Sequence, residues 1–151
     1  MRRSHGQLVV FEPTASLPLG SQRVVVRTHP GTIAYLHDAQ WAADLPRLVQ
    51  DRLIGGFETA HILRAVGRPG LLADRGLNTD IRHFEVDVTR GQAIVEIYAR
   101  LVAGDGRVVA AKLFSATAPT AGDRPAAITA ALSQAFAKVL HDLVIWAAPR
   151  V

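Results

Sequence analysis

The sequence predicts an α+β fold in which a mainly antiparallel sheet is covered on one face by two amphipathic helices. Glycine-containing turns at residues 90–91 and 104–106 divide residues 79–117 into three consecutive stretches of strand character. Residues 40–61 and 126–147 each carry apolar side chains at intervals of three and four, the spacing of one helix face. Two such helices must bury their apolar stripes, so we expect a two-layer sandwich with a C-terminal three-strand meander.

The length and composition fit one domain. The chain has 151 residues, of which 49% are hydrophobic, and this is enough to bury a core. Residues 1–6 are polar and are expected to be flexible, so the single domain is expected over 7–149. The absence of cysteine excludes disulfides and thiolate metal sites. No apolar run approaches the ~18 residues of a membrane-spanning helix, and we expect none.

The N-terminal half is expected to supply short strands and the first helix. Residues 7–12 and 23–28 have strand character, and 32–36 fits a short edge strand. The periodicity predicts a helix over 40–61, followed by a short strand at 62–66. The apolar stripe of this helix comprises Leu45, Leu48, Val49, Leu53 and Phe57.

Both helices carry start signals in the sequence. Asp44 is a candidate N-cap for the first helix, and Asp123 is one for the second, where Pro125 suits the first turn. The Gly55-Gly56 pair weakens the end of the first helix by ~1 kcal/mol per glycine relative to alanine. The second helix has the stronger stripe, which comprises Ile128, Leu132, Ala135, Phe136, Val139, Leu143 and Trp146.

The hydrophobic pattern of the three C-terminal stretches predicts their pairing register. The turn at 90–91 places Phe84 opposite Ile97, and the turn at 104–106 places Ile97 opposite Leu113 and Leu101 opposite Val109. This register gathers apolar residues on the helix-covered face, and a one-residue slip would turn them outward. The other face is expected to carry His83, Glu85, Glu96, Tyr98, Arg100 and Lys112.

The charge pattern does not indicate a nucleic-acid site. Lys and Arg total 17 against 13 acidic residues, a net charge of +4, and the pI is near 10.3. The cations are scattered singly, whereas nucleic-acid binders usually concentrate them on one face or helix. Aromatic residues make up 6%, too few for a base-stacking platform. We expect a solvated basic surface, with attraction to anionic lipid headgroups as the alternative.

No residue pattern predicts catalysis or metal binding. The six histidines show no spacing of three or four residues, which a helical zinc site would require. Glu85 and Asp87 share a strand face, as a metal or acid–base pair would require, but Arg82, Arg90 and Lys112 favour ion pairing. No serine lies in G-x-S-x-G. We therefore predict no enzyme, no metal and no cofactor, and a small hydrolase or nucleic-acid binder is the weakest alternative.

A few aromatic and charged residues are candidates for an interface. Tyr35 and Trp41 flank the start of the first helix, where they serve either core packing or anchoring at a protein or lipid interface. The same two interpretations apply to Tyr98 on the mixed face of the sheet. The candidate interface residues are Tyr35, Trp41, His83, Tyr98 and Lys112.

Five stretches of the chain form a recognisable pattern. They are RVVVRTHPGTIAYLHDAQWAADLPRLVQDRLIGGFE at 23–58, AVGRPG at 65–70, LNTDIRHFEVDV at 77–88, RVVAAKLFSATAP at 107–119 and AFAKVLHDLVIWA at 135–147. Together they resemble the ABC-type transport auxiliary lipoprotein family, which includes the auxiliary lipoprotein of the paraquat-inducible operon. The resemblance extends from about residue 8 to 148.

The resemblance implies a non-enzymatic periplasmic protein in an ABC-type system that transports lipid or similar apolar substrates. Its implied partners are a mammalian-cell-entry-type substrate-binding protein and an ABC permease with its ATPase, and a homo-oligomer stays open. The family pattern begins with a signal peptide, a lipid-attachment cysteine and a strand, so a lipid anchor is expected only in a longer precursor.

A lipid-carrying module is the alternative function. It predicts a cavity between the helices and the sheet, although a filled core is favoured because large apolar side chains pack tightly in a domain of this size. The expected lining of that cavity is Phe57, Phe136, Ile97 and Leu113.

Overall fold

The fold is mixed α+β, with one large sheet and two helices. The structure is a computed structural model that describes residues 6–16, 18–29, 32–70 and 72–151. In these residues the strands are β1 (Gln7–Val10), β2 (Thr14–Ala15), β3 (Arg23–His29), β4 (Thr32–Gln40), β5 (Ala65–Gly67), β6 (Arg75–Asp87), β7 (Gln92–Val102) and β8 (Val108–Pro119). The helices are α1 (Leu45–Ala60), α2 (Pro125–Ala147) and the short 3₁₀ helix η1 (Ala148–Arg150).

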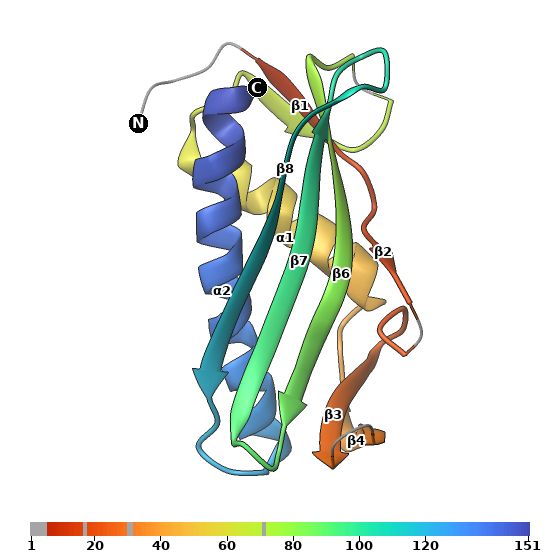
Figure 1. Cartoon of the computed structure of the whole chain (residues 1–151), viewed down its shortest axis with the longest axis vertical. Helices are drawn as coiled ribbons and strands as arrows, with labels where there is room; N and C mark the ends of the chain where they lie inside the picture. Colours follow the sequence, from red (N-terminus) through yellow and green to blue (C-terminus); the bar gives the residue numbers. More distant parts are fainter. Residues whose placement is uncertain (1–5, 17, 30–31, 71) are drawn as a thin grey trace.

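Strand β6 is the centre of the sheet. β1, β2 and β3 pair with it in parallel along one side, and β7 pairs antiparallel along the other. β4 extends the sheet beyond β3, β5 extends it beyond β1, and β8 extends it beyond β7. In Figure 1, β6, β7 and β8 lie in front of both helices. Most of the paired residues lie in antiparallel ladders, as expected. The short parallel pairings were not predicted, because partners far apart in sequence leave no local signal.

The register of β6 and β7 differs by two residues from the one predicted at their turn. Phe84 pairs with Val95 and not with Ile97, and Asp87 pairs with Gln92. The connection is therefore longer than the expected two-residue turn. Because the side-chain period of a strand is two, this shift leaves Phe84 and Val86 on the predicted face.

The longer β6–β7 turn is held by an aspartate. One carboxylate oxygen of Asp87 accepts hydrogen bonds from the backbone N–H of Thr89 (3.0 Å) and of Arg90 (3.3 Å), and from the Thr89 hydroxyl (2.6 Å). Gly91 has φ of 63°, a left-handed conformation that glycine adopts without steric cost. An Asx-type turn with glycine therefore replaces the tight turn.

The predicted register of β7 and β8 is wrong by one residue. Val102 pairs with Val108, which fits the expected alignment, but a register shift lies between Val102 and Leu101. A β-bulge adds one residue to one strand and moves every later pair. Ile97 therefore lies opposite Phe114 and not opposite Leu113.

This slip exchanges the two faces of β8. Phe114 is 4% exposed on the helix-covered side, whereas Leu113 and Val109 are 42% and 44% exposed. Lys112 also changes sides, and its Nζ lies 5.4 Å from the centroid of the Phe114 ring. The prediction that Lys112 lies on the polar face of the sheet is therefore wrong.

α1 begins later than predicted, whereas α2 begins at Pro125, one residue earlier than predicted. β4 continues to Gln40, so α1 starts at Leu45; Asp44 occupies the N-cap position but its side chain makes no capping hydrogen bond. Arg124, not Asp123, is the N-cap residue of α2. Both predicted stripes pack inward, and only Leu48 and Trp146 among their members are partly exposed. The residues buried from α1 and α2 are Leu45, Val49, Gln50, Leu53, Ile54, Phe57, Ile128, Ala131, Leu132, Ala135, Phe136, Val139, Leu143, Val144 and Ala147.

The C-terminal helical segment is longer and more apolar than expected. The run Pro125–Arg150 meets the length and composition of a membrane-spanning helix, which corrects the expectation that the chain holds none. In the structure its stripe packs against β6, β7 and β8. A buried core helix passes the same test of length and composition.

The N-terminal residues meet the C-terminal end of the fold. Residues 1–5, where we expected flexibility, lie outside the described residues. The Gly6 carbonyl accepts a hydrogen bond from the N–H of Arg64 at 3.0 Å, and a side chain on Gly6 would meet Val151. The strand expected at 62–66 is displaced to Ala65–Gly67, where β5 pairs with β1.

Candidate interaction surfaces

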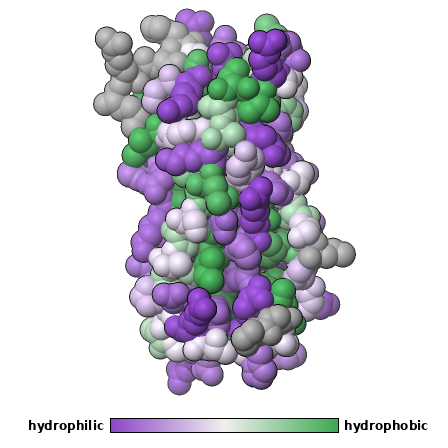
Figure 2. Space-filling view, in the orientation of Figure 1, coloured by the Kyte–Doolittle hydropathy of each residue, from purple (hydrophilic) through white to green (hydrophobic). Residues whose placement is uncertain are grey.

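One face of the sheet is covered by neither helix and is here called the open face. Phe84 points to α2, where its ring centroid lies 5.5 Å from that of Phe136. The neighbouring residues His83 and Glu85 therefore project to the opposite side. Figure 2 shows this face, on which apolar and hydrophilic side chains lie interspersed.

A charged network crosses three strands of the open face. Arg27 of β3 donates from Nε to Glu85 of β6 at 2.9 Å, and its terminal nitrogen lies 2.7 Å from the same oxygen. The other Glu85 oxygen is 2.7 Å from Nδ1 of His83. Nε2 of His83 lies 3.7 Å from Glu96 of β7. Glu85 is 4% exposed, so these partners replace the water that would otherwise bind its carboxylate.

A second cluster surrounds Tyr98 on β7. The guanidinium carbons of Arg82 and Arg100 lie 4.7 and 5.2 Å from the centre of its ring, within the range of cation–π attraction. Arg82 lies at the register shift between Ile81 and His83. A β-bulge changes the direction in which the side chain of the extra residue points. The Nε of Arg82 also lies 3.6 Å from Asp80.

One carboxyl group at the end of the open face has a shifted pKa. The Thr89 hydroxyl holds the pKa of Asp87 below its ordinary value of 3.8, with added help from the backbone N–H groups of Arg90 and Thr89 and the charge of Arg90. Partial burial acts in the opposite direction but does not prevail. Asp87 therefore keeps its negative charge in moderately acidic solution and fixes the β6–β7 turn.

Tyr35 and Trp41 lie away from the Tyr98 cluster. Tyr35 of β4 is 39% exposed, and the guanidinium carbon of Arg23 lies 4.8 Å from its ring centre. Trp41 packs edge-on against Phe84 with ring centroids 5.6 Å apart. For Trp41, this contact supports the core-packing interpretation.

A small apolar cleft lies between the helices and the sheet. Its volume is about 220 Å³, and its lining includes Trp41, Leu48, Phe84, Phe136 and Leu140. Of the four residues expected to line a lipid cavity, only Phe136 contributes. Phe57 and Ile97 are buried in the core, and Leu113 lies on the open face because of the register shift.

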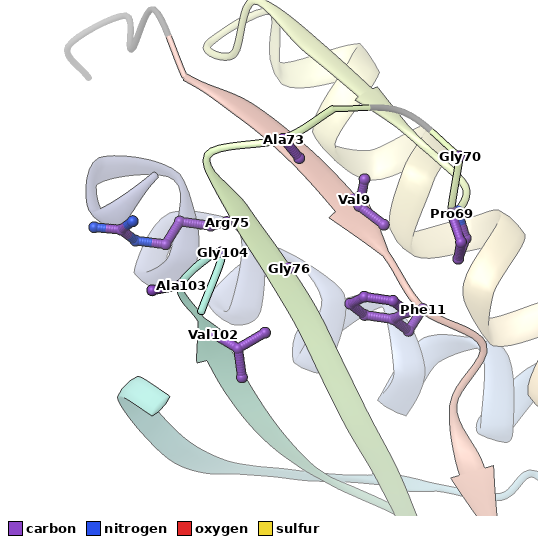
Figure 3. Close-up of a pocket in the computed structure, with 10 residues that line it drawn as sticks. All are labelled: Val9, Phe11, Pro69, Gly70, Ala73, Arg75, Gly76, Val102, Ala103 and Gly104. Atoms are coloured by element: carbon purple, nitrogen blue, oxygen red, sulfur yellow. The ribbon is translucent and has the colours of Figure 1, made fainter. Parts of the chain in front are cut away.

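A second hollow of about 230 Å³ lies at the end of the sheet where β6 begins. Figure 3 shows the Phe11 ring next to Gly76 of β6, with Val102 on the other side. A Cβ on Gly76 would lie 2.5 Å from Phe11 and 3.1 Å from Val102, so glycine is required for this close packing. Arg75 points away from the Phe11 ring in the same view.

Metal-ligating side chains do not cluster in the part of the chain that the structure describes. Within that part, no group of three or more His, Asp or Glu side chains is placed to hold a metal ion. His83 and Glu85 are hydrogen-bonded, and Arg27 occupies the second carboxylate oxygen; among the described residues, no hydrogen bond joins a hydroxyl group to either side chain. The network can orient charges for recognition, and it lacks the parts of a nucleophile–base pair.

The five predicted interface residues do not form one surface. His83 and Tyr98 share the open face, whereas Trp41 faces the helices, Lys112 lies on the helix-covered side and Tyr35 is on the outermost strand β4. Sequence reasoning missed Arg27 and Arg82 as members of the open-face clusters. The two-residue spacing of Tyr98 and Arg100 indicates that both lie on one face of β7. The sequence contains no comparable signal for the parallel β3–β6 pairing, which brings in Arg27, or for the β6 bulge, which brings in Arg82.

One family model matches nearly the whole chain. The family of the ABC-type transport auxiliary lipoprotein component matches residues 2–144. An uncharacterized protein of Bradyrhizobium diazoefficiens, bll6063, is 39% identical over 146 residues, 92% of this chain. The match covers 38% of that protein, so the chain spans about two fifths of the length of this curated relative.

Two solved structures share the fold. Protein XCC0632 from Xanthomonas campestris is 32% identical, with a TM-score of 0.90 over 97% of this chain and 86% of that one. A dodecamer of a PelC point variant from Paraburkholderia phytofirmans is 11% identical, with a TM-score of 0.54 over 92% and 89% of the two chains, and shows likeness of fold alone. From the family match over nearly its whole length, the chain belongs to the ABC-type transport auxiliary lipoprotein component family.

Proposed function

We propose that the protein is a non-enzymatic periplasmic auxiliary component of an ABC-type system for lipid or other apolar substrates. In this proposal it docks on a mammalian-cell-entry-type substrate-binding protein, beside the permease and its ATPase, and a lipid anchor on the longer precursor holds it at a membrane. Family membership supports the transport role. The partner, the lipid substrate and the periplasmic location are parts of the proposal.

The open face supports docking by its residue content. Tyr98 with Arg82 and Arg100 combines an aromatic ring with two guanidinium groups, the residue types enriched at the centre of protein interfaces. The neighbouring Arg27–Glu85–His83 network holds its charges in fixed positions on a rigid sheet. A preorganised surface loses little conformational freedom on binding.

Co-purification tests this function. The full-length, membrane-anchored protein is expected to retain the mammalian-cell-entry-type protein of the same system. Arg100→Glu should weaken retention about tenfold or more, since it reverses a charge in the Tyr98 cluster. Arg47→Glu is the matched control, because Arg47 is an exposed arginine on α1. Equal retention by both variants, or none by the wild type, contradicts the proposal.

Lipid carriage is the second candidate function. The cleft at Trp41, Phe84 and Phe136 favours it because these rings offer an apolar surface to a hydrocarbon chain. Its volume of about 220 Å³ falls below the ~300 Å³ at which small-molecule sites usually begin. Native mass spectrometry of protein purified from membranes should then show a bound lipid that is lost in Phe136→Trp, and an absence of any lipid adduct removes this candidate.

A further inference from the structure

The outer edge of β8, the side turned away from β7, is an unpaired strand edge. Among the described strands, β8 pairs with β7 alone. The strand is long, with twelve residues from Val108 to Pro119. Such an edge presents free backbone donors and acceptors, and these form a template on which another strand can add.

A single hydrogen bond identifies the groups that point outward. Nζ of Lys138, on α2, donates to the carbonyl oxygen of Thr117 at 2.9 Å, so this carbonyl points away from β7. In an antiparallel strand both backbone groups of a residue point to the same side, and alternate residues share that side. Ala111, Leu113 and Ser115 therefore direct their N–H and C=O groups to the outer edge.

The two ends of this edge are protected and its middle is not. A bulge disturbs the strand next to Val108, and at the other end Lys138 occupies the Thr117 carbonyl and Pro119 closes the strand. These are the devices by which proteins block unwanted strand addition. The intervening residues 110–116 contain no proline and one charged residue, Lys112.

The edge has room for another strand. A groove of about 680 Å³ runs between β8 and α2, lined by residues 115–117 of β8 and by Gln134, Lys138, His141 and Asp142 of α2. An added strand lies about 4.8 Å from its neighbour. One set of its side chains would lie beside Leu113 on the open face, and the other set would enter the groove.

We propose that the β8 edge binds an extended segment of a partner protein in which apolar and acidic residues alternate. The apolar set would cover Leu113, which is 42% exposed. The acidic set would face Lys112 and Lys138, which are the two lysines of the sequence, while β8 contains no acidic residue. Asp142 is the one carboxylate among the residues that line the groove, and its single negative charge can neutralise only one of the two lysine charges.

This inference goes beyond the proposed transport function and does not rest on it. Its basis is the backbone geometry and the charge at one strand edge. The edge can bind such a segment whether or not the partner is of the mammalian-cell-entry type, so the peptide experiment below and the co-purification experiment fail independently.

A short peptide of alternating Val and Glu is the probe. We expect it to bind, to slow hydrogen exchange at the amides of Ala111, Leu113 and Ser115, and to shift their NMR signals. A peptide in which Lys replaces each Glu should bind about tenfold more weakly or worse, because it meets Lys112 and Lys138. Equal binding of both peptides, or protection elsewhere in the chain, overturns the proposal.

Ser115→Pro is the matching protein variant. It removes an outward N–H and leaves the groups that pair with β7, as proline does on an edge strand. Ser115→Ala keeps the backbone donor and is the control. The Val/Glu peptide should bind Ser115→Ala as it binds the wild type and lose about tenfold or more with Ser115→Pro.

Hydrogen exchange on the wild type keeps the test decisive if Ser115→Pro does not fold. The amides of Ala111, Leu113 and Ser115 should exchange quickly in the free protein and slowly with the Val/Glu peptide. Sedimentation shows whether copies of this chain cover the edge. If the free protein dimerises and already protects these amides, a second copy occupies the edge and the proposed partner is wrong.

Discussion

The Arg27 guanidinium lies 2.7 Å from the buried carboxylate of Glu85, although the two residues are 58 positions apart in the chain. Their contact joins β3 to β6 on the open face. We expect Arg27→Ala to lower the free energy of unfolding by about 1–3 kcal/mol, because it leaves a buried charge with His83 as its remaining close partner.

Urea unfolding measures this effect, with Arg23→Ala as the control. Arg23 lies on the same strand, and the interaction described for its side chain is the contact with the Tyr35 ring, which is worth about 0.5–1 kcal/mol at an exposed site. A loss in Arg27→Ala no larger than in Arg23→Ala would mean that the ion pair contributes nothing to stability.

Acid should weaken the protein through Asp87. Its pKa is lower in the folded protein than the ordinary 3.8, so its stabilising contribution is complete above that value and is lost as the pH falls through the folded pKa. Asp87→Asn should therefore be less stable than the wild type at pH 7, and the difference should shrink in strong acid. Urea titrations at several pH values measure this, and a constant difference across the range contradicts it.

The register of β7 and β8 can be tested with two adjacent residues. Phe114→Ala should cost about 3–5 kcal/mol, because Phe114 is buried against the Trp146 ring. Leu113→Ala should cost under ~1 kcal/mol, since Leu113 is on the open face. Thermal unfolding compares the two variants, and the reverse order would restore the register predicted from the sequence.

Two adjacent glycines of α1 should respond differently to alanine. Gly55 has open space where a Cβ would lie, so Gly55→Ala should stabilise the protein by about 0.5–1 kcal/mol through helix propensity. At Gly56 a Cβ would lie 3.0 Å from Leu140 of α2, and the crowding should cancel part or all of that gain. The melting temperatures of the two variants measure this difference. An equal rise in melting temperature for both variants would show that Leu140 moves aside freely.

The helix stripes could be predicted from the sequence because they depend on spacing within one element. Leu53 and Phe57 of α1, and Leu132 and Val139 of α2, lie in the core as the periodicity predicts. The prediction of the β8 register failed for a local reason. One bulged residue, which no composition signal marks, places Lys112 and Leu113 each on the face opposite to the one predicted for it.

The open-face clusters could be predicted only in part. His83 and Glu85 share a face because they are two residues apart on one strand, and the sequence placed both correctly on the mixed face. Arg27 joins them through a parallel pairing, which depends on the whole fold. The longer β6–β7 turn pairs His83 with Glu96, so His83 contacts both Glu85 and Glu96.

The central position of β6 has a consequence for the order of folding. Leu8 pairs with Arg75, Thr14 with Asp80 and Val25 with Glu85, so three early strands lack their central partner β6 until the middle of the chain has emerged. Contacts so distant in sequence form slowly, because a long loop must close first. During synthesis, apolar residues such as Leu8 and Val25 therefore stay accessible to chaperones longer than the locally paired C-terminal strands do.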